Sequence, residues 1–400
     1  MAGTALQIIS ATANLQAAWL KLFERSTARS RRSSGVDDET LIDFDASPLA
    51  RCRLLSQQLR NKSGYQFSAL QAHLVPKKDG RDRVICVPTV RDRVVQRAIV
   101  DFLSKGDRCG LANAVSFGFI PGRSVEKAVE RARALRREFP WAYKTDISSF
   151  FDSIPRSVLH ERIRRYVHGR SLHRLLIAAS ESEIQATSGS REKRIKQAGI
   201  MKGRGIRQGM PLSPFFANLI LKEFDRSIQA AAIPMVRYAD DLICFSKTQF
   251  DVPAIHSTVE AALKKEGLEI PQPGPSSKTQ LFAPNDAAEF LGLHLRQQNG
   301  DYLLEVSKEQ TLKIRQRIIE FADFSTLQRA KIDLGGFFRR IDGMIAGYSG
   351  AYAFAHNAAH FERALDGARE DAVERLFSVG LGIPIGSIST EGKKFLGIAS

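Results

Sequence analysis

The sequence predicts an α+β fold, and three features carry that prediction. Short apolar segments bounded by turn residues recur between residues 74 and 295, as in antiparallel hairpins. Helical apolar spacing occupies residues 11–24 and most of the chain from about residue 308. The 400 residues are enough to bury a large core, either in one unit of several subdomains or in two to three lobes.

The chain is strongly basic, which bears on its partner. It contains 59 Lys plus Arg against 43 Asp plus Glu, a formal charge of +16, and the basic residues are spread along the sequence. Such an excess favours a polyanion such as nucleic acid, with an unspecific basic surface as the alternative. Composition does not distinguish DNA from RNA.

The cysteines and apolar segments favour a soluble, cytoplasmic protein. Cys52, Cys86, Cys109 and Cys244 form no C-x-x-C pair, so neither a zinc ribbon nor a disulfide framework is expected. The first residues lack a basic leader, and no run of eighteen apolar residues occurs. We therefore expect no membrane contact.

Two helices and a hairpin are expected in the N-terminal part. Residues 11–24 and 49–62 have helical apolar spacing, and an Arg/Ser-rich stretch lies between them. Residues 74–88 alternate as a hairpin that turns at Asp79-Gly80 and carries four basic residues at its tip. Taken alone, such a tip is equally typical of a solvated hairpin end.

Further helices are expected after the loops that follow. One begins at Thr89, another covers residues 125–138 with Ser124 as its N-cap, and a third ends near Gln229. Before the third lies a basic run whose glycines do not have the setting of a dinucleotide fingerprint. Its basic residues are Arg191, Lys193, Arg194, Lys196, Lys202, Arg204 and Arg207.

The last part of the chain changes from mixed to helical structure. A helix near 254–266, a Pro- and Gly-rich loop over 271–279 and an alternating strand over 289–295 are predicted first. Amphipathic helices are then expected over residues 308–323, 326–350 and 357–378.

Two acidic clusters are the candidate catalytic centre. Residues 235–245 predict a strand, a tight turn at Ala239-Asp240 and a second strand, with Asp240 and Asp241 adjacent. Adjacent carboxylates repel unless a cation holds them, so the stretch is either an exposed acidic tip or a divalent metal site. Asp146, at the end of another short strand, favours the metal site, because two-metal phosphoryl transfer needs carboxylates from separate strands.

These clusters carry a resemblance to a known family. Tyr-Ala-Asp-Asp after a strand, with Asp-x-x-x-x-Phe-Asp well before it, resembles the palm of reverse transcriptases of the group II intron type and their standalone bacterial relatives. The resemblance covers roughly residues 11–350. Its other segments lie in the family's order, over residues 14–19, 35–37, 88–96, 116–124, 208–219 and 289–295.

The resemblance implies a right-hand polymerase whose catalytic residues are these acids. Asp146, Asp240 and Asp241 would hold two Mg²⁺ ions, with Mn²⁺ as a substitute and the Ile147 carbonyl as a further ligand. Phe151 would exclude a ribose 2′-hydroxyl, with a buried core aromatic as the alternative. The implied nucleotide-binding residues are Lys77, Arg83, Phe151, Gln208 and Lys278, and the implied nucleic-acid-binding residues are Arg123, Arg191, Arg194, Lys202 and Arg204.

The resemblance also implies the domain organisation. The expected regions are an N-terminal helical extension over 1–70, fingers with part of the palm over 71–140, a palm over 141–300 with a basic insertion at 180–207, and a helical thumb with a C-terminal extension over 301–400.

The implied reaction is RNA-directed DNA synthesis from deoxynucleotide triphosphates on a primer 3′-hydroxyl. The expected partners are an RNA template, a dedicated noncoding RNA in the favoured setting, and a DNA primer or product, with protein partners left open. No Cys/His-rich endonuclease tail is visible, and the stretch beyond the thumb is too short for an RNase H domain, so a standalone enzyme of antiviral defence is expected. Protein-primed or untemplated synthesis and a non-catalytic, maturase-like RNA-binding protein remain alternatives.

Overall fold

The computed structural model describes residues 3–76, 80, 82–185, 188–274, 277–396 and 398. They form two compact units. The first comprises Met1–Ser124, Tyr143–Cys244 and Phe250–Gln280, and the second comprises Val125–Ala142, Phe245–Gln249 and Leu281–Ser400. Helices and antiparallel strands occur in both, so the α+β class is confirmed.

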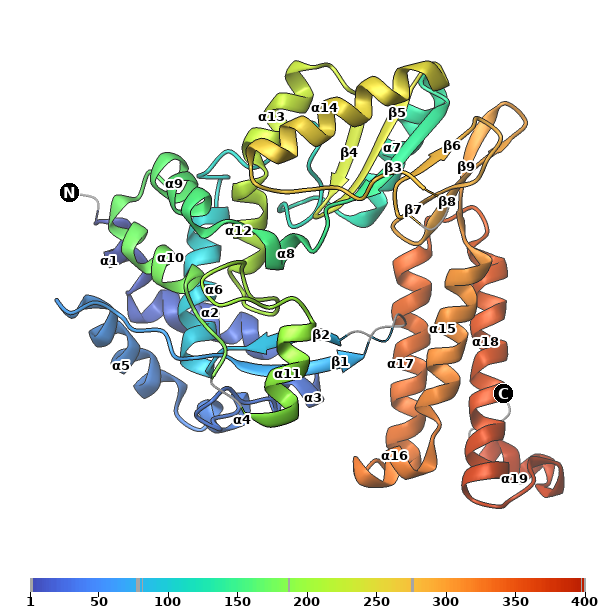
Figure 1. Ribbon diagram of the computed structural model, residues 1–400. Coiled ribbons are helices and arrows are strands. Elements are labelled where there is room, and N and C mark those ends of the chain that lie inside the picture. Colours follow the sequence, from blue (N-terminus) through green and yellow to red (C-terminus); the bar gives the residue numbers. More distant parts are fainter. Residues whose placement is uncertain are drawn as a thin grey trace. The chain divides into compact units, whose positions relative to one another are not determined.

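Helices dominate the N-terminal part of the first unit (Figure 1). α2 packs against α5 and α6, and it buries Leu15 and Trp19 in the core of the unit. The helices predicted over 11–24 and 49–62 are confirmed to within two residues. The bounds in this part are α1 Ala5–Ile9, α2 Thr12–Glu24, α3 Ala28–Arg31, α4 Leu41–Asp45, α5 Pro48–Arg60 and α6 Val90–Ser104.

A two-stranded hairpin lies next to a helix of the basic run. β1 (Gln71–Pro76) and β2 (Asp82–Val87) are antiparallel, with Pro76 opposite Asp82. In α11 (Gly189–Gln197), both ends of the Arg194 guanidinium bond the Asp82 carboxylate at 2.8 Å, and Arg191 donates to the Ala72 carbonyl. The hairpin and α11 are thus linked at two points.

The four-stranded sheet has the order β4-β5-β3-β6. β4 (Met235–Tyr238) and β5 (Asp241–Ser246) form the predicted hairpin, and their apolar side chains are fully buried. One helix was predicted to run to Gln229, but it divides at Leu221, where ψ is 0°. The other elements between residues 141 and 282 are β3 Trp141–Asp146, α8 Phe150–Ser153, α9 Arg156–Tyr166, η1 Arg170–Leu172, α10 His173–Ser180, α12 Ser213–Ile220, α13 Lys222–Ala230, η2 Gln249–Asp251, α14 Val252–Lys265 and β6 Gln280–Phe282.

The second unit contains a three-stranded sheet of order β7-β8-β9. Residues 289–295, predicted to alternate as a strand and matched to a hairpin segment of the resembled family, form a hairpin, because Leu291 and Gly292 have φ of 53° and 80° and turn the chain between β7 and β8. Arg133 and Arg137 of α7 (Val125–Glu138) pair with Asp301 at 3.0 and 2.5 Å. The strands are β7 Ala288–Phe290, β8 Leu293–Gln298 and β9 Asp301–Val306.

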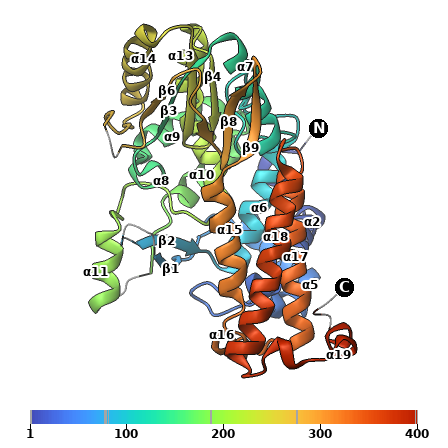
Figure 2. The same ribbon diagram turned by 90° about the vertical axis from the view of Figure 1, so that its right-hand side faces the viewer.

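Helices form the rest of the second unit, and α15, α17 and α18 lie side by side (Figures 1 and 2). The single helix predicted over 326–350 is wrong: the chain turns at Lys331, where φ is 52°, and Asp333 caps a new helix. None of the described helices is long and apolar enough to cross a membrane. The bounds are α15 Lys308–Phe321, α16 Phe324–Arg329, α17 Leu334–Tyr352, α18 Ala358–Glu374, η3 Arg375–Gly380, η4 Ile385–Ser387 and α19 Thr390–Phe395.

Candidate active site

Three carboxylates lie at adjacent strand ends in the first unit. β3 ends at Asp146, and the β4–β5 turn presents Asp240 and Asp241. β5 lies beside β3 in the sheet, and the backbone N–H of Ile147 donates to the Asp240 carbonyl at 3.1 Å. The fold therefore brings together two acidic clusters that are far apart in the sequence.

Burial and mutual repulsion disfavour the charged forms of these acids. Burial, with Asp240 and Asp146 nearby, raises the pKa of Asp241 to about 6. Burial also raises the pKa of Asp240, with a further contribution from Asp146, while Lys278 and Arg83 act in the opposite direction. Such a cluster favours the approach of a cation, which relieves the repulsion.

One lysine already contacts the cluster. The Lys278 ammonium is paired with Oδ2 of Asp146, whereas Oδ1 of Asp146 is buried without a hydrogen-bond partner. Nearby, the buried hydroxyls of Thr145 and Thr279 are 2.7 Å apart, which ties β3 to the segment that carries Lys278. Buried carboxylate oxygens normally have a hydrogen-bond partner or a cation, so the unpaired Oδ1 of Asp146 is available to bind a ligand.

The donor set fits a divalent cation that takes part of its coordination from substrate. No group of three or more His, Cys, Asp or Glu side chains in the described ranges is arranged to enclose a metal ion by itself. Mg²⁺ is usually held by one or two carboxylates together with water and substrate phosphates. Asp146, with its orphaned oxygen, and Asp240 and Asp241, with their mutual repulsion, supply ligands of this type.

A buried arginine fixes the turn that carries two of the acids. Arg237 of β4 is 0% exposed, and its Nε and Nη2 bond the Asp225 carboxylate of α13 at 2.7 and 2.6 Å. Its other N–H groups donate to Asn218 Oδ1 and the Ala239 carbonyl at 3.1 Å and to Ser116 Oγ at 2.7 Å. All five guanidinium donors are therefore satisfied inside the protein.

The same turn is packed against a glycine. Ala239 has φ of 58°, a left-handed conformation that costs free energy for a residue with a side chain. A Cβ at Gly118 would lie 2.3 Å from the Ala239 nitrogen, and the Gly118 carbonyl accepts a hydrogen bond from Asn218 Nδ2 at 2.9 Å. Close backbone approach and the Arg237 bond together hold Ala239 in the conformation that aims Asp240 and Asp241.

The residues predicted to bind the nucleotide lie in different settings. Phe151 is half-buried beside Phe150, with 5.2 Å between ring centroids, and its carbonyl accepts from Ile206 N–H at 2.7 Å. The Gln208 carbonyl accepts from the Cys86 N–H at 2.7 Å, so its loop rests on β2. Arg83, on β2, is exposed and close enough to lower the pKa of Asp240. Lys77 lies outside the described residues.

Several residues predicted to bind nucleic acid also make bonds within the protein. Arg123 donates to the carbonyls of Asn113 and Ser116. Arg191 and Arg194 attach α11 to the hairpin, as described above. Lys202 is exposed, and Arg204 is exposed with one long bond of 3.4 Å to the Ser153 carbonyl. Their role in nucleic-acid binding stays a prediction.

Sequence reasoning missed the buried ion networks. Besides the Arg237–Asp225 pair, Glu183 accepts from Arg156 at 2.8 Å and Arg207 at 2.7 Å. Although burial opposes it, these arginines and the Gly203 N–H hold the pKa of Glu183 below its usual range. A signal was present for one network, because an arginine in an otherwise apolar strand needs a buried partner.

Comparisons with known proteins identify the family of the chain. A family described as "Reverse transcriptase (RNA-dependent DNA polymerase)" matches residues 75–295. Protein YkfC of Escherichia coli K12 is 25% identical over 334 residues, which cover 72% of this chain and 82% of that protein. The retron Ec83 reverse transcriptase of Escherichia coli is 24% identical over 200 residues, covering 48% of this chain and 58% of that protein.

A third relative belongs to the intron type. The group II intron-encoded protein LtrA of Lactococcus lactis subsp. cremoris is 23% identical over 206 residues, covering 49% of this chain and 31% of LtrA. The chain thus spans most of YkfC but less than two thirds of the retron and intron proteins.

Breaking the buried ion pair on one side should be costly. We expect Arg237→Met to lower the free energy of unfolding by about 3–5 kcal/mol, because Asp225 keeps its buried charge without a cation. The double variant Arg237→Met/Asp225→Leu should recover most of that loss, since no charge remains buried. Urea denaturation measures both. A double variant no more stable than the single one would contradict this account.

Asp241 should make the metal-free protein less stable as pH rises. Its pKa in the folded state, about 6, exceeds the ordinary aspartate value of 3.8, so the stabilisation from its bound proton is present near pH 4 and lost as pH rises through about 6. Asp241→Asn in EDTA should therefore be more stable than the wild type at about pH 8, by up to about 3 kcal/mol, with the difference vanishing near pH 4. Urea denaturation across this range checks the sign, and an advantage that grows on acidification would refute it.

Proposed function

The chain belongs to the reverse transcriptase (RNA-dependent DNA polymerase) family, and from this premise we propose that it extends a primer 3′-hydroxyl with deoxynucleotides on an RNA template. The observation that carries the proposal is the grouping of Asp146, Asp240 and Asp241 at adjacent strand ends, with Lys278 and Arg83 close by. Clustered carboxylates facing a polyanion need a cation between them, and this requirement fits catalysis better than RNA binding alone.

The reaction joins the primer oxygen to the α-phosphorus of the triphosphate and releases pyrophosphate. The three acids and the Ile147 carbonyl would hold divalent cations, Mg²⁺ or in its place Mn²⁺, which supply charge neutralisation for the attacking and leaving oxygens. Lys278, and for Asp240 also Arg83, lie close enough to act on these acids, and their positive charge would stabilise the negative charge that develops on the leaving group. Arg237 and Gly118 keep the turn rigid, so the acids meet the substrate without rearranging.

The ion pair between Lys278 and Asp146 would have to break when substrate and a cation bind. Lys278 is 74% exposed on its side chain, whereas Asp146 is 14% exposed. The lysine is therefore free to turn toward a triphosphate, and Asp146 then offers both oxygens to a cation. This exchange of partners keeps the buried carboxylate neutralised throughout.

Phe151 is the proposed sugar-selecting residue. Its half-buried ring follows β3 and packs on Phe150, and its backbone is held by Ile206, so the ring has a fixed base from which to exclude a 2′-hydroxyl. Gln208, in the loop that rests on β2, would support the incoming nucleotide, and Arg123, Lys202 and Arg204 would contact nucleic acid.

The proposed partners are an RNA template, a DNA primer and deoxynucleotide triphosphates. A dedicated noncoding RNA and a role in antiviral defence are proposed by analogy with standalone relatives, because no side chain specifies either. The proposed thumb is the bundle of α15, α17 and α18, and the proposed fingers include the β1–β2 hairpin.

Replacing one acid should remove the chemistry but not the fold. We expect purified protein with Mg²⁺ to extend a DNA primer on an RNA template with deoxynucleotides, and Asp240→Asn to reduce extension to background, because a cation ligand is lost. Asp45→Asn, an exposed acid on α4, is the matched control and should retain full activity. Extension by Asp240→Asn at the wild-type rate would overturn the assignment. Incorporation without template that survives nuclease treatment would favour untemplated synthesis.

Shortening Phe151 should relax sugar selection. Phe151→Ala should raise kcat/KM for a ribonucleotide relative to its deoxynucleotide by about tenfold or more, because steric discrimination of this kind is worth about 1–3 kcal/mol. Phe151→Tyr should keep the discrimination, since it keeps the ring. Single-nucleotide extension assays measure the ratio. An unchanged ratio in Phe151→Ala would assign the residue to the core.

A further inference from the structure

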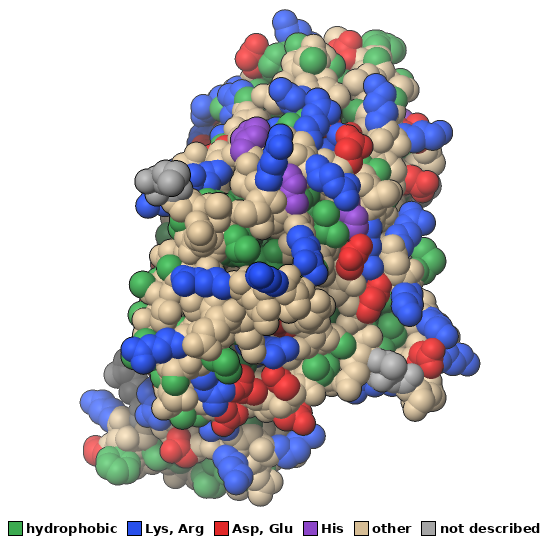
Figure 3. Space-filling model, turned by 90° about the vertical axis from the view of Figure 1, so that its left-hand side faces the viewer, with side chains coloured by type: hydrophobic (Ala, Val, Ile, Leu, Met, Phe, Trp, Pro, Cys, Tyr) green, Lys and Arg blue, Asp and Glu red, His purple; other side chains and the backbone are tan. Residues whose placement is uncertain are grey.

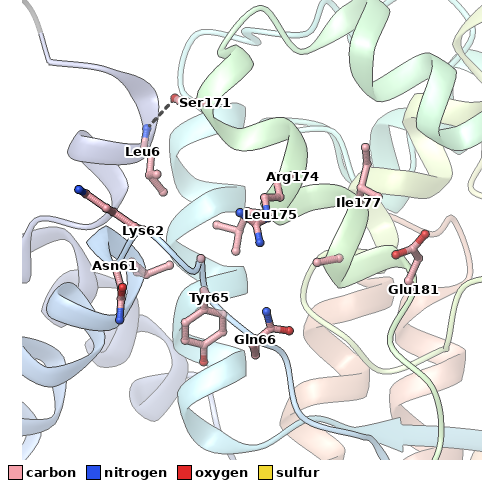
Figure 4. A pocket seen from close by; sticks show the side chains of 13 residues that line it. Leu6, Asn61, Lys62, Tyr65, Gln66, Ser171, Arg174, Leu175, Ile177 and Glu181 are labelled. Atoms are coloured by element: carbon pink, nitrogen blue, oxygen red, sulfur yellow. Dashed lines mark hydrogen bonds between the residues drawn. The ribbon is translucent and has the colours of Figure 1, made fainter.

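A groove on the first unit lies apart from the carboxylates (Figure 4). It has a volume of about 660 Å³ and is bounded by α1, the end of α5 and the segment after it, and η1 with α10. No residue of the acidic cluster, or of the network that supports its turn, lines it. In Figure 1, α1, α5 and α10 lie around α2 and α6, away from the β4–β5 hairpin.

The groove combines an apolar floor with a polar rim. Leu59, Leu175 and Ile177 supply apolar surface, and Lys62, Gln66 and Arg174 stand at the rim. Arg174 donates to the Ser63 carbonyl at 2.8 Å, and the Cα of Gly64 packs on it closely enough that a Cβ there would lie 3.1 Å from the guanidinium carbon. The charge at the rim is thus held in place while remaining exposed.

The chain segment that leads into α10, one wall of the groove, is rich in basic residues. Residues 156–174 contain six arginines and three histidines but a single acid, Glu161. Arg156 and Arg162 are buried in ion pairs, whereas the other four arginines are exposed, and none of these four has a carboxylate partner among the described side chains. Figure 3, which shows the left-hand face of Figure 1, has many Lys and Arg side chains interspersed with apolar ones and with fewer Asp and Glu. The exposed arginines are Arg164, Arg165, Arg170 and Arg174.

We propose that this groove binds a single-stranded segment of the RNA partner outside the active site, with a base on the apolar floor and the flanking phosphates on the basic rim. This inference rests on the proposed function, which requires an RNA partner. Ligand pockets are typically about 300–1,000 Å³, and the volume of this groove lies in that range. Single strands are recognised by bases stacked on aromatic rings or Arg guanidinium planes and by cations along the backbone, and here the exposed Arg174 guanidinium and Lys62 are available for such contacts beside the apolar side chains.

The rim also offers hydrogen bonds to a base or a ribose. Asn61 and Gln66 provide exposed amides, and Ser171 provides a hydroxyl that accepts from the Leu6 N–H at 3.1 Å. The Tyr65 hydroxyl is already bonded to Asp92 Oδ1 at 2.7 Å, so Tyr65 contributes only its ring face. Glu181, at one end, disfavours a phosphate there and directs the strand toward Lys62 and Arg174.

The first test measures RNA binding without nucleotides or metal, so it does not depend on catalysis. Lys62→Ala/Arg174→Ala should weaken binding of a fluorescein-labelled single-stranded RNA and lower the slope of log K against log salt by about 1.4, since each phosphate contact contributes about 0.7. Lys62→Ala/Arg170→Ala should act in the same direction while leaving the Ser63 bond in place. Fluorescence anisotropy at several salt concentrations gives both quantities.

A matched control distinguishes RNA binding at the groove from binding that depends only on the net charge of the protein. Lys264→Ala/Lys265→Ala removes two exposed cations from α14 of the same unit, so the net charge changes equally. It should leave the salt slope unchanged. Equal losses in the control and groove variants would overturn the proposal, because binding would then follow total charge alone.

A second measurement tests the floor. Ala178→Trp places a large side chain in the groove without altering charge and should weaken RNA binding, while primer extension on a saturating template should continue. Photo-cross-linking of RNA that contains 4-thiouridine should map to residues 61–66 and 171–178 in the wild type and be lost in Ala178→Trp. Cross-links confined to the active site would overturn the proposal.

Different results would refute the two proposals. If the wild type bound RNA and formed cross-links in the groove but incorporated no nucleotide, the proposed polymerase function would be refuted and the proposed RNA-binding groove would stand. If every groove variant incorporated nucleotides normally and bound RNA as the wild type does, the proposed RNA-binding role of the groove would be refuted and the polymerase function would stand.

Discussion

The buried Arg237–Asp225 ion pair is the interaction on which the rest of the site depends. It joins β4 to α13, and through Asn218 and Ser116 it also joins α12 and the loop before α7. One of its donors reaches the carbonyl of Ala239, whose left-handed conformation aims the neighbouring acids. Hydrogen bonds from four separate segments therefore fix the position of this turn. They hold the turn in place against the electrostatic repulsion between the acids that it carries.

Charge in the site is balanced over short distances. Asp240 and Asp241 resist ionisation because they are buried and face each other and Asp146, whereas Lys278, Arg83 and Lys144 act in the opposite direction. The excess of negative charge is local in a chain whose formal charge is +16. A strongly basic chain thus carries a small acidic centre, a combination that favours a polyanionic partner together with cations at the centre.

Much of this organisation could be predicted from the sequence, and the remainder has a physical reason. Tyr238-Ala-Asp-Asp between two apolar runs specifies its own hairpin locally, and α2, α5 and α14 follow from apolar spacing. The apolar pattern alone could not place the turn between β7 and β8, because Leu291 adopts a positive φ that its side chain disfavours. The partner of Arg237 could not be predicted either. Asp225 lies on another element, and an ion pair between two elements produces no periodic pattern in the sequence.

The link between α11 and the β1–β2 hairpin has a mechanical consequence. Arg194 and Arg191 attach the helix at Asp82 and Ala72, so any displacement of the hairpin that carries Arg83 would be coupled to α11, and the two would act as one lever. Half of the Arg194 side chain is in contact with solvent, so dissolved ions weaken its pairing with Asp82. The stiffness of that lever is thus set partly by the ionic strength around it, and a polyanion lying along α11 would alter it in the same way.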